Sequence, residues 1–272
     1  MDPTYLHFWA KQNAYILGVI FPVSIGFGVI LIGLAAIFVY TFRQQHYRLW
    51  HLGKEEDCSD RIPERLKTFL SVVFGHARFW REGYPGTMHF LIFWGTVLVF
   101  LGKGIRIFSL LTGLTVPPQG TYLFASFIAE IGGMIILLGG VMAVVRRFVV
   151  KPPRLDSKPD DHLKYLWVFL IILTGYLIKS YRLVLAGGGL PTDSYSWAPI
   201  SSILTHFMLI LPSDALNELF FWHRVLIHVI PAVAFFGYIV VSRSSLEHIY
   251  LSAINVFFEV CQYLCESGRF AH

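Results

Sequence analysis

Residues 86–111 have the sequence GTMHFLIFWGTVLVFLGKGIRIFSLL. A helix that crosses hydrocarbon needs roughly 20 mostly apolar residues, and this stretch has only three ionisable side chains, His89, Lys103 and Arg106. It therefore predicts a membrane-spanning helix. Because hydrocarbon penalises a polar group that lacks a partner, ionisable residues within a span are functional candidates.

The whole chain shows the same character. It is 55% hydrophobic and 14% charged, whereas a soluble domain carries about 25% charged residues. Five stretches are long and apolar enough to span a bilayer: 15–42, 86–111, 121–145, 163–185 and 216–241. They predict an all-α integral membrane protein, a bundle of five transmembrane helices within residues 1–260, followed by a short cytoplasmic tail, 261–272. The alternating ten-residue strands of a membrane barrel are not found in the sequence.

The basic residues predict the orientation of this bundle. Sixteen of the 22 lysines and arginines lie on one side of the predicted spans: eight in 43–81, six in 146–164, and Arg243 and Arg269. Basic residues in short loops accumulate on the cytoplasmic side, so we expect the N-terminus outside and the C-terminus in the cytoplasm. The net charge of +5 is then a topology signal and predicts no nucleic-acid partner.

Two connections and one set of glycines have a predicted role. The inner connection, 44–85, contains an amphipathic stretch, 66–79, expected on the inner membrane surface. The outer connection, 186–213, contains a short apolar piece, 200–211, which is too short to span and is expected in the interface with membrane lipids. Four glycines of the third span lie seven apart in pairs: Gly132, Gly133, Gly139 and Gly140. They allow close approach, either of a neighbouring helix or of a flat cofactor.

The cysteines argue against a metal cluster held by this chain. There are three, Cys58, Cys261 and Cys265, with no CxxC pair among them. An iron–sulfur cluster is usually held by four cysteine ligands. If electrons reach this chain from such a cluster, we expect the cluster to lie in a partner subunit.

His89 and His248 are predicted to lie at one depth, near the cytoplasmic face. In the predicted topology the second span begins near His89 and the fifth ends just before His248. A neutral imidazole is a good iron ligand, and two of them can hold a b-type haem without covalent attachment. We expect an inner haem b between them. The alternative is that each histidine bonds a lipid headgroup or a backbone carbonyl.

His228 predicts a second site nearer the outer face. It lies 20 residues before His248, which is roughly one membrane thickness of helix. On the second span, Lys103 follows His89 by 14 residues, close to four helical turns, and therefore lies on nearly the same face. Arg106 follows at the outer end.

Three interpretations of this outer region remain open. His228 ligates a second haem, or it hydrogen-bonds a quinone headgroup together with Lys103 and Arg106, or Lys103 only extends to the outer surface. The candidate haem ligands opposite His228 are His206, His223 and Lys103. Glu130, in the third span, either relays protons to the quinone or pairs with Lys103 or Lys179.

Three stretches carry a resemblance to a known family: MHFLIFWG at 88–95, the run from Trp222 through His228 to SSLEHIY at 244–250, and AINVFF at 253–258. They resemble the gamma subunit of respiratory nitrate reductase. They resemble more closely the membrane cytochrome b subunits of heterodisulfide-reductase-like and sulfite-reduction-associated complexes.

In that family, five helices hold two b haems between the second and fifth helices. A menaquinone-type site lies near the outer haem, and a cytoplasmic iron–sulfur protein docks at the inner face. The resemblance implies that His89 and His248 ligate the inner haem and that His228 ligates the outer one. This chain departs from the nitrate reductase protein at Val99, which stands where that protein has a further histidine, so the ligand opposite His228 is left open.

The sequence thus predicts an electron-carrying subunit of a quinone oxidoreductase complex in the plasma membrane of a bacterium or archaeon. Its expected cofactors are one or two haems b and menaquinone or another lipid quinone. Its expected partner is a cytoplasmic iron–sulfur subunit of the heterodisulfide-reductase-like type. The competing interpretations are a haem-free membrane anchor and a transporter-type bundle.

Overall fold

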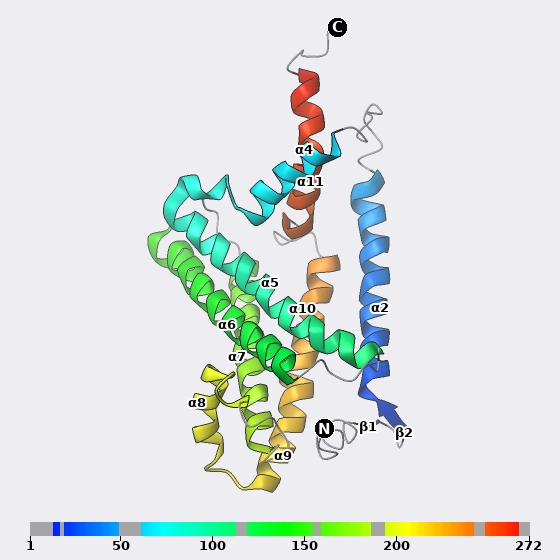
Figure 1. Cartoon of the computed structure of the whole chain (residues 1–272), viewed down its shortest axis with the longest axis vertical. Coiled ribbons are helices and arrows are strands. Elements are labelled where there is room, and N and C mark those ends of the chain that lie inside the picture. Colours follow the sequence, from blue (N-terminus) through cyan, green and yellow to red (C-terminus); the bar gives the residue numbers. More distant parts are fainter. Residues whose placement is uncertain are drawn as a thin grey trace. The chain divides into compact units, whose positions relative to one another are not determined.

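The computed structural model of the 272-residue chain describes these residues: 13–16, 19–48, 61–112, 119–153, 155, 159–185, 194–241 and 248–266. The chain divides into two compact units. The first contains Met1–Leu31 and Met88–Phe235, and the second contains Ile32–Thr87 and Phe236–His272. The unit boundaries fall within three helices, α2 (Val23–Phe42), α5 (Gly83–Thr112) and α10 (Ile230–Val241). Figure 1 shows these elements coloured along the sequence.

The described N-terminal residues form a short hairpin before the first helix. Strands β1 (Asn13–Ile16) and β2 (Val19–Pro22) pair antiparallel, and α2 begins at Val23. The prediction of a helical span from residue 15 is therefore wrong for residues 15, 16 and 19–22, which lie in these strands. Pro22 gives the reason, because it has no N–H to donate and disfavours helical geometry in the residue before it. Every other described element is helical, as the composition predicts.

Three predicted spans are confirmed as long helices: α5, α6 (Gln119–Val144) and α7 (Pro159–Leu185). Among the described residues, three helical runs are long and apolar enough to cross a membrane. They are Ile62–Ile105, which includes most of α5, Leu123–Val150 and Asp161–Leu185. Leu226–Ile239 and His248–Phe258 are shorter apolar helices. The chain is thus a helical, membrane-associated protein, whereas the count of five spans and the orientation remain predictions.

Glycines hold α5, α6 and α7 close together, and α5 and α6 run side by side in Figure 1. A Cβ atom added at Gly132 would lie 2.7 Å from the carbonyl oxygen of Gly95, and one added at Gly139 would lie 2.8 Å from Cγ1 of Ile92. The neighbouring glycines, Gly133 and Gly140, lie on the other side of α6, where they contact α7. A Cβ added at Gly133 would meet the Tyr176 hydroxyl of α7 at 2.6 Å. The predicted small-residue face therefore packs against helices on both sides.

The predicted fifth span is one helical stretch with a change of pitch in its middle. It consists of α9 (Ser213–Trp222), the π-helix η7 (His223–Val229) and α10. Pro231 is the second residue of α10 and offers no N–H to the carbonyl four residues earlier, so the regular hydrogen-bond pattern cannot run through this point. The carbonyl oxygen of Pro231 instead accepts a hydrogen bond from Nε1 of Trp167, at 2.9 Å. Short π-helical turns occur often at functional sites, and this one contains His228.

The second unit contains the predicted amphipathic stretch. It forms α4 (Ile62–Phe69), the π-turn η2 (Leu70–Phe74) and the short helix η3 (Phe79–Glu82). Helix α11 (His248–Glu266) packs on α4, with the rings of Phe69 and Phe257 6.3 Å apart. Helix α11 is not predicted from the sequence, and the tail boundary at 260/261 falls inside it. Charged and amide residues interrupt the sequence of this helix, so it lacks the continuous apolar run of a span.

Candidate functional site

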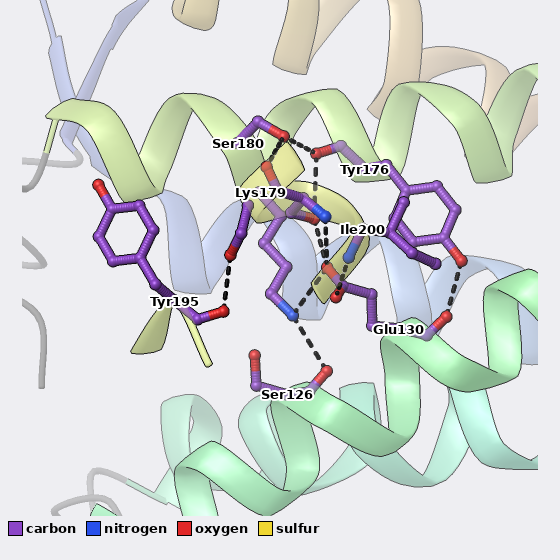
Figure 2. Close-up of polar contacts among 9 residues, drawn as sticks. Ser126, Glu130, Tyr176, Lys179, Ser180, Tyr195 and Ile200 are labelled. Carbon is purple, nitrogen blue, oxygen red and sulfur yellow. Dashed lines mark hydrogen bonds and ion pairs between the residues drawn. The ribbon is translucent and has the colours of Figure 1, made fainter. Parts of the chain in front are cut away.

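The Glu130 carboxylate is a fully buried charged group of the first unit, with no exposed surface on its side chain. Figure 2 shows the groups that surround it. The backbone N–H of Ile200 donates to Oε2 at 3.1 Å, and the N–H of Ser201 donates to Oε1 at 3.2 Å. The Ser201 hydroxyl donates to the same carboxylate, and Nζ of Lys179 lies 3.2 Å from Oε1. The negative charge is therefore matched by four donors.

These contacts explain how helix α8 (Pro199–Met208) begins. The first N–H groups of a helix have no partner within it, and the cap residue of α8, Ala198, offers no side-chain oxygen. Glu130, from α6, supplies the missing acceptor and also places a negative charge at the positive end of the helix dipole. The predicted apolar piece at 200–211 is thus a helix, and its first turn is anchored to α6.

The same cluster also joins α6, α7 and α8 through hydrogen bonds to backbone oxygens. The Tyr176 hydroxyl donates to the backbone oxygen of Glu130 at 2.7 Å, and Lys179 donates to the backbone oxygen of Ser126 at 3.1 Å. The Ser180 hydroxyl lies 2.9 Å from the oxygen of Tyr176 and 3.0 Å from that of Ser201. Of the two lysines considered for Glu130, Lys179 is the one that pairs with it. The arrangement compensates a buried charge.

His228 occupies a different kind of setting, on η7 against α7. Its Nδ1 lies 2.9 Å from the hydroxyl of Thr174, which is 5% exposed. The ring also lies close to Gly175, where an added Cβ would be 3.3 Å from Cε1 of His228. Thr174 and Gly175 together form a notch on α7 that receives the imidazole. The other ring nitrogen, Nε2, is not part of this contact.

Cationic and neutral nitrogen groups gather near this imidazole. Lys103 of α5, Arg182 of α7 and His223 of η7 each interact electrostatically with His228. The ring of His223 packs against Tyr181, with centroids 5.7 Å apart, and its buried Nε2 has no hydrogen-bond partner within the part of the chain that the structure describes. Such a set fits a ligand that offers negative charge or accepts hydrogen bonds.

The remaining predicted residues have simple positions. His206 is exposed on α8, and its Nδ1 lies 3.2 Å from the backbone oxygens of Ser202 and Ile203 in its own helix. Lys103 is exposed. Arg106 belongs to α5, and its side chain lies outside the described part of the structure.

His89 and His248 belong to different units. His89 is half-buried on α5 in the first unit, and His248 is the exposed first residue of α11 in the second. Their pairing on a shared haem remains a prediction. The described residues contain no group of three or more His, Cys, Asp or Glu side chains that would hold a metal ion; axial ligation of haem requires only one or two protein ligands.

Several site residues of α7 do not follow from the sequence: Thr174, Gly175, Tyr176 and Ser180. A signal was present, because hydroxyl side chains in an otherwise apolar span need partners inside the bundle. Arg182 is another site residue that the sequence does not predict, since the sequence suggests only a charge on the outer side at this position. The partners themselves are far away in sequence, Glu130 by 46 residues from Tyr176 and His228 by 54 from Thr174.

Comparison with known proteins finds relatives that are oxidoreductases or a subunit of one. Over 235 residues the chain is 28% identical to EtfAB:quinone oxidoreductase of Syntrophomonas wolfei, a match that covers 85% of this chain and 33% of the relative. It is also 28% identical over 224 residues to the probable iron–sulfur-binding oxidoreductase FadF of Bacillus subtilis, covering 82% of this chain and 30% of that one. The chain spans about a third of the length of these two relatives.

A third relative is a subunit of the dihydromethanophenazine:CoB–CoM heterodisulfide reductase of Methanosarcina acetivorans. It is 30% identical over 148 residues, which are 52% of this chain and 56% of the relative. No family model matches the chain, and no solved structure matches it. The similarities support a membrane subunit of the heterodisulfide-reductase-like kind, associated with an oxidoreductase that transfers electrons.

Proposed function

We propose that this chain is a haem b subunit that passes electrons between the lipid quinone pool and an iron–sulfur partner. The observation that carries the proposal is the position of His228. Its Nδ1 is hydrogen-bonded to the hydroxyl of Thr174 at 2.9 Å, which leaves Nε2 as the nitrogen that would bind a metal. The relatives support the proposal independently, since their names include a quinone oxidoreductase, an iron–sulfur-binding oxidoreductase and a heterodisulfide reductase.

His89 and His248 are the proposed ligands of an inner haem, and His228 is a proposed ligand of an outer one. Haem supplies one-electron chemistry when bound. His223 and His228 lie five residues apart on one short helix, so the two of them would not hold the same haem together. The ligand opposite His228 therefore comes from another element, and Lys103 of α5 and His206 of α8 are the candidates.

The proposed quinone site lies at the outer end of the bundle. Lys103 and Arg106 are cationic donors on α5 that suit the carbonyl oxygens of a quinone headgroup. Because the Glu130 carboxylate already accepts from Ile200, Ser201 and Lys179, we assign it to holding α8 in place, in preference to the proton relay considered from the sequence.

The proposed topology has five spans, with the N-terminus outside and the C-terminus in the cytoplasm of a bacterial or archaeal plasma membrane. Helix α2 is 20 residues long and highly apolar, which suits the first span. The connected helices α9, η7 and α10 run from residue 213 to 241 and suit the fifth. The basic inner connections then face the iron–sulfur partner, which is proposed to be of the heterodisulfide-reductase-like type.

Reduced-minus-oxidised spectra of the purified protein test the haem proposal. We expect a b-type α band, and pyridine extraction should give two haems per chain. His89→Ala and His248→Ala should remove one centre, and His228→Ala should remove the other. His162→Ala is the matched control, because the ring of His162 stacks on that of Phe148 with centroids 4.3 Å apart and has no place in the haem proposal. A colourless, well-folded wild-type preparation would overturn the proposal in favour of an anchor or a transporter.

The quinone proposal needs a separate measurement. Lys103→Ala should slow quinol oxidation severalfold, whereas Lys67→Ala, on α4 in the second unit, should not. A normal rate of quinol oxidation in Lys103→Ala would remove Lys103 from the quinone site. If Lys103→Ala also loses the haem that depends on His228, Lys103 is an axial ligand of that haem.

A further inference from the structure

The hydroxyl of Thr174 lies between two groups that together determine where its hydrogen points. It is 2.9 Å from Nδ1 of His228 and 2.6 Å from the backbone oxygen of Leu170. The backbone oxygen of Ile171 lies 3.3 Å from the hydroxyl, and it also hydrogen-bonds the imidazole of His228. Thr174 is buried, so bulk water does not compete strongly for these contacts.

The chemistry of the groups sets the direction of each hydrogen bond. A carbonyl oxygen only accepts, and a hydroxyl has a single hydrogen. The Thr174 hydroxyl therefore donates to Leu170 and accepts from His228. Nδ1 of the neutral imidazole must then carry the ring proton, and Nε2 must carry the lone pair.

Gly175 makes this contact possible. A Cβ atom at this position would lie 3.3 Å from Cε1 of His228 and 4.0 Å from Nδ1, so an alanine would press on the ring. Thr174 thus supplies a side-chain acceptor in addition to the backbone oxygen of Ile171, and Gly175 supplies the room for the ring beside it. Both features act on one histidine from one turn of α7.

We propose that Thr174 is a positioning residue for His228: its hydroxyl fixes the tautomer and orientation of the imidazole, so that Nε2 would be the nitrogen that binds iron. This inference rests on the proposed function, in which His228 ligates the outer haem. Histidines that bind metals commonly donate their second N–H to an acceptor, and loss of that acceptor typically weakens metal binding 10- to 100-fold. An acceptor at Nδ1 also makes the imidazole a stronger donor and favours the ferric state.

Thr174→Val tests the inference, because valine keeps the shape and removes the side-chain acceptor, leaving His228 only the backbone oxygen of Ile171. We expect the centre that is lost in His228→Ala to bind haem about tenfold more weakly. In the haem that remains, we expect a more positive midpoint potential and altered electron paramagnetic resonance of the ferric iron. Thr174→Ser restores a hydroxyl and should restore all three properties.

The chain offers a matched control in Thr96. Its hydroxyl also donates to the carbonyl oxygen four residues earlier, Ile92, at 2.7 Å, so Thr96→Val removes the same backbone contact from another helix. It should leave the His228 centre unchanged. Gly175→Ala provides a second route, because it displaces the ring while keeping the Thr174 hydroxyl, and it should perturb the same centre.

The outcomes separate the two proposals. If His228→Ala leaves all haem in place, the outer-haem assignment fails and this inference falls with it. If His228→Ala removes a centre but Thr174→Val matches wild type in haem content, potential and resonance spectrum, only the role of Thr174 is overturned. If Thr174→Val does not fold, the Gly175→Ala variant decides. An unperturbed haem centre in that variant overturns the proposal that Thr174 and Gly175 position His228, and a perturbed centre supports it.

Discussion

Glu130 and His228 are both ionisable side chains within the first unit, yet their surroundings differ in kind. The carboxylate of Glu130 accepts from two backbone N–H groups and a hydroxyl and is paired with Lys179. The imidazole of His228 is held through Nδ1 by the Thr174 hydroxyl and has cationic neighbours. A buried polar group whose bonding capacity is filled stabilises the fold, whereas one that retains a lone pair is available to a ligand.

The largest effect that would break this comparison is expected at Glu130. Glu130→Ala leaves the half-buried Lys179 without its counter-charge and leaves the first turn of α8 without a cap. Breaking a buried ion pair by removing one partner costs about 3–5 kcal/mol. Thermal unfolding in detergent should show the loss, and Glu218→Ala, at an exposed position of α9, should not.

The spectroscopic signals of the haems make the Glu130→Ala test more specific. In Glu130→Ala protein that still folds, the centre that depends on His228 should keep its midpoint potential. A selective loss of that centre with normal thermal stability would show that Glu130 serves the cofactor, and the division between an anchoring cluster and a ligand site would then be wrong.

An intermediate effect is expected where α5 and α6 touch. Gly132→Ala places a Cβ atom 2.7 Å from the backbone oxygen of Gly95, so the helices must separate. Overpacking of this kind costs about 1–3 kcal/mol. Gly104→Ala is the matched control on α5, because nothing lies within 4 Å of its added Cβ, and there alanine should stabilise the helix by about 0.5–1 kcal/mol. Equal unfolding temperatures for the two variants would contradict the close packing.

The elements that depend on local composition could be predicted from the sequence. Helices α5, α6 and α7 follow from continuous apolar stretches, and the short α8 follows from an apolar piece too brief to span. The hairpin before α2 and the separate helix α11 were missed. At α2 the apolar run continues across Pro22 without a break in composition, and at α11 polar residues interrupt the apolar pattern.

The site divides in the same way. His228, Lys103 and Glu130 could be found because an ionisable residue stands out in an apolar stretch. Their partners could not be chosen, since Ser201 and Thr174 are common residues whose importance depends on contacts 71 and 54 residues away. For Glu130, the sequence left Lys103 and Lys179 as alternatives, and only the packing of α6 against α7 identifies Lys179.

The smallest effect compares two tyrosines that both donate to a backbone carbonyl. Tyr176 is buried and donates to the oxygen of Glu130 at 2.7 Å, whereas Tyr195 is 44% exposed and donates to that of Leu183 at 2.9 Å. Tyr176→Phe should lower the free energy of unfolding by about 0.6 kcal/mol, the average for a hydrogen bond between membrane helices. Tyr195→Phe should cost less, because water replaces the lost partner. If Tyr195→Phe proved the more damaging, the outer connection would contribute more to stability than the anchoring cluster, and burial would not explain why Glu130 and His228 differ.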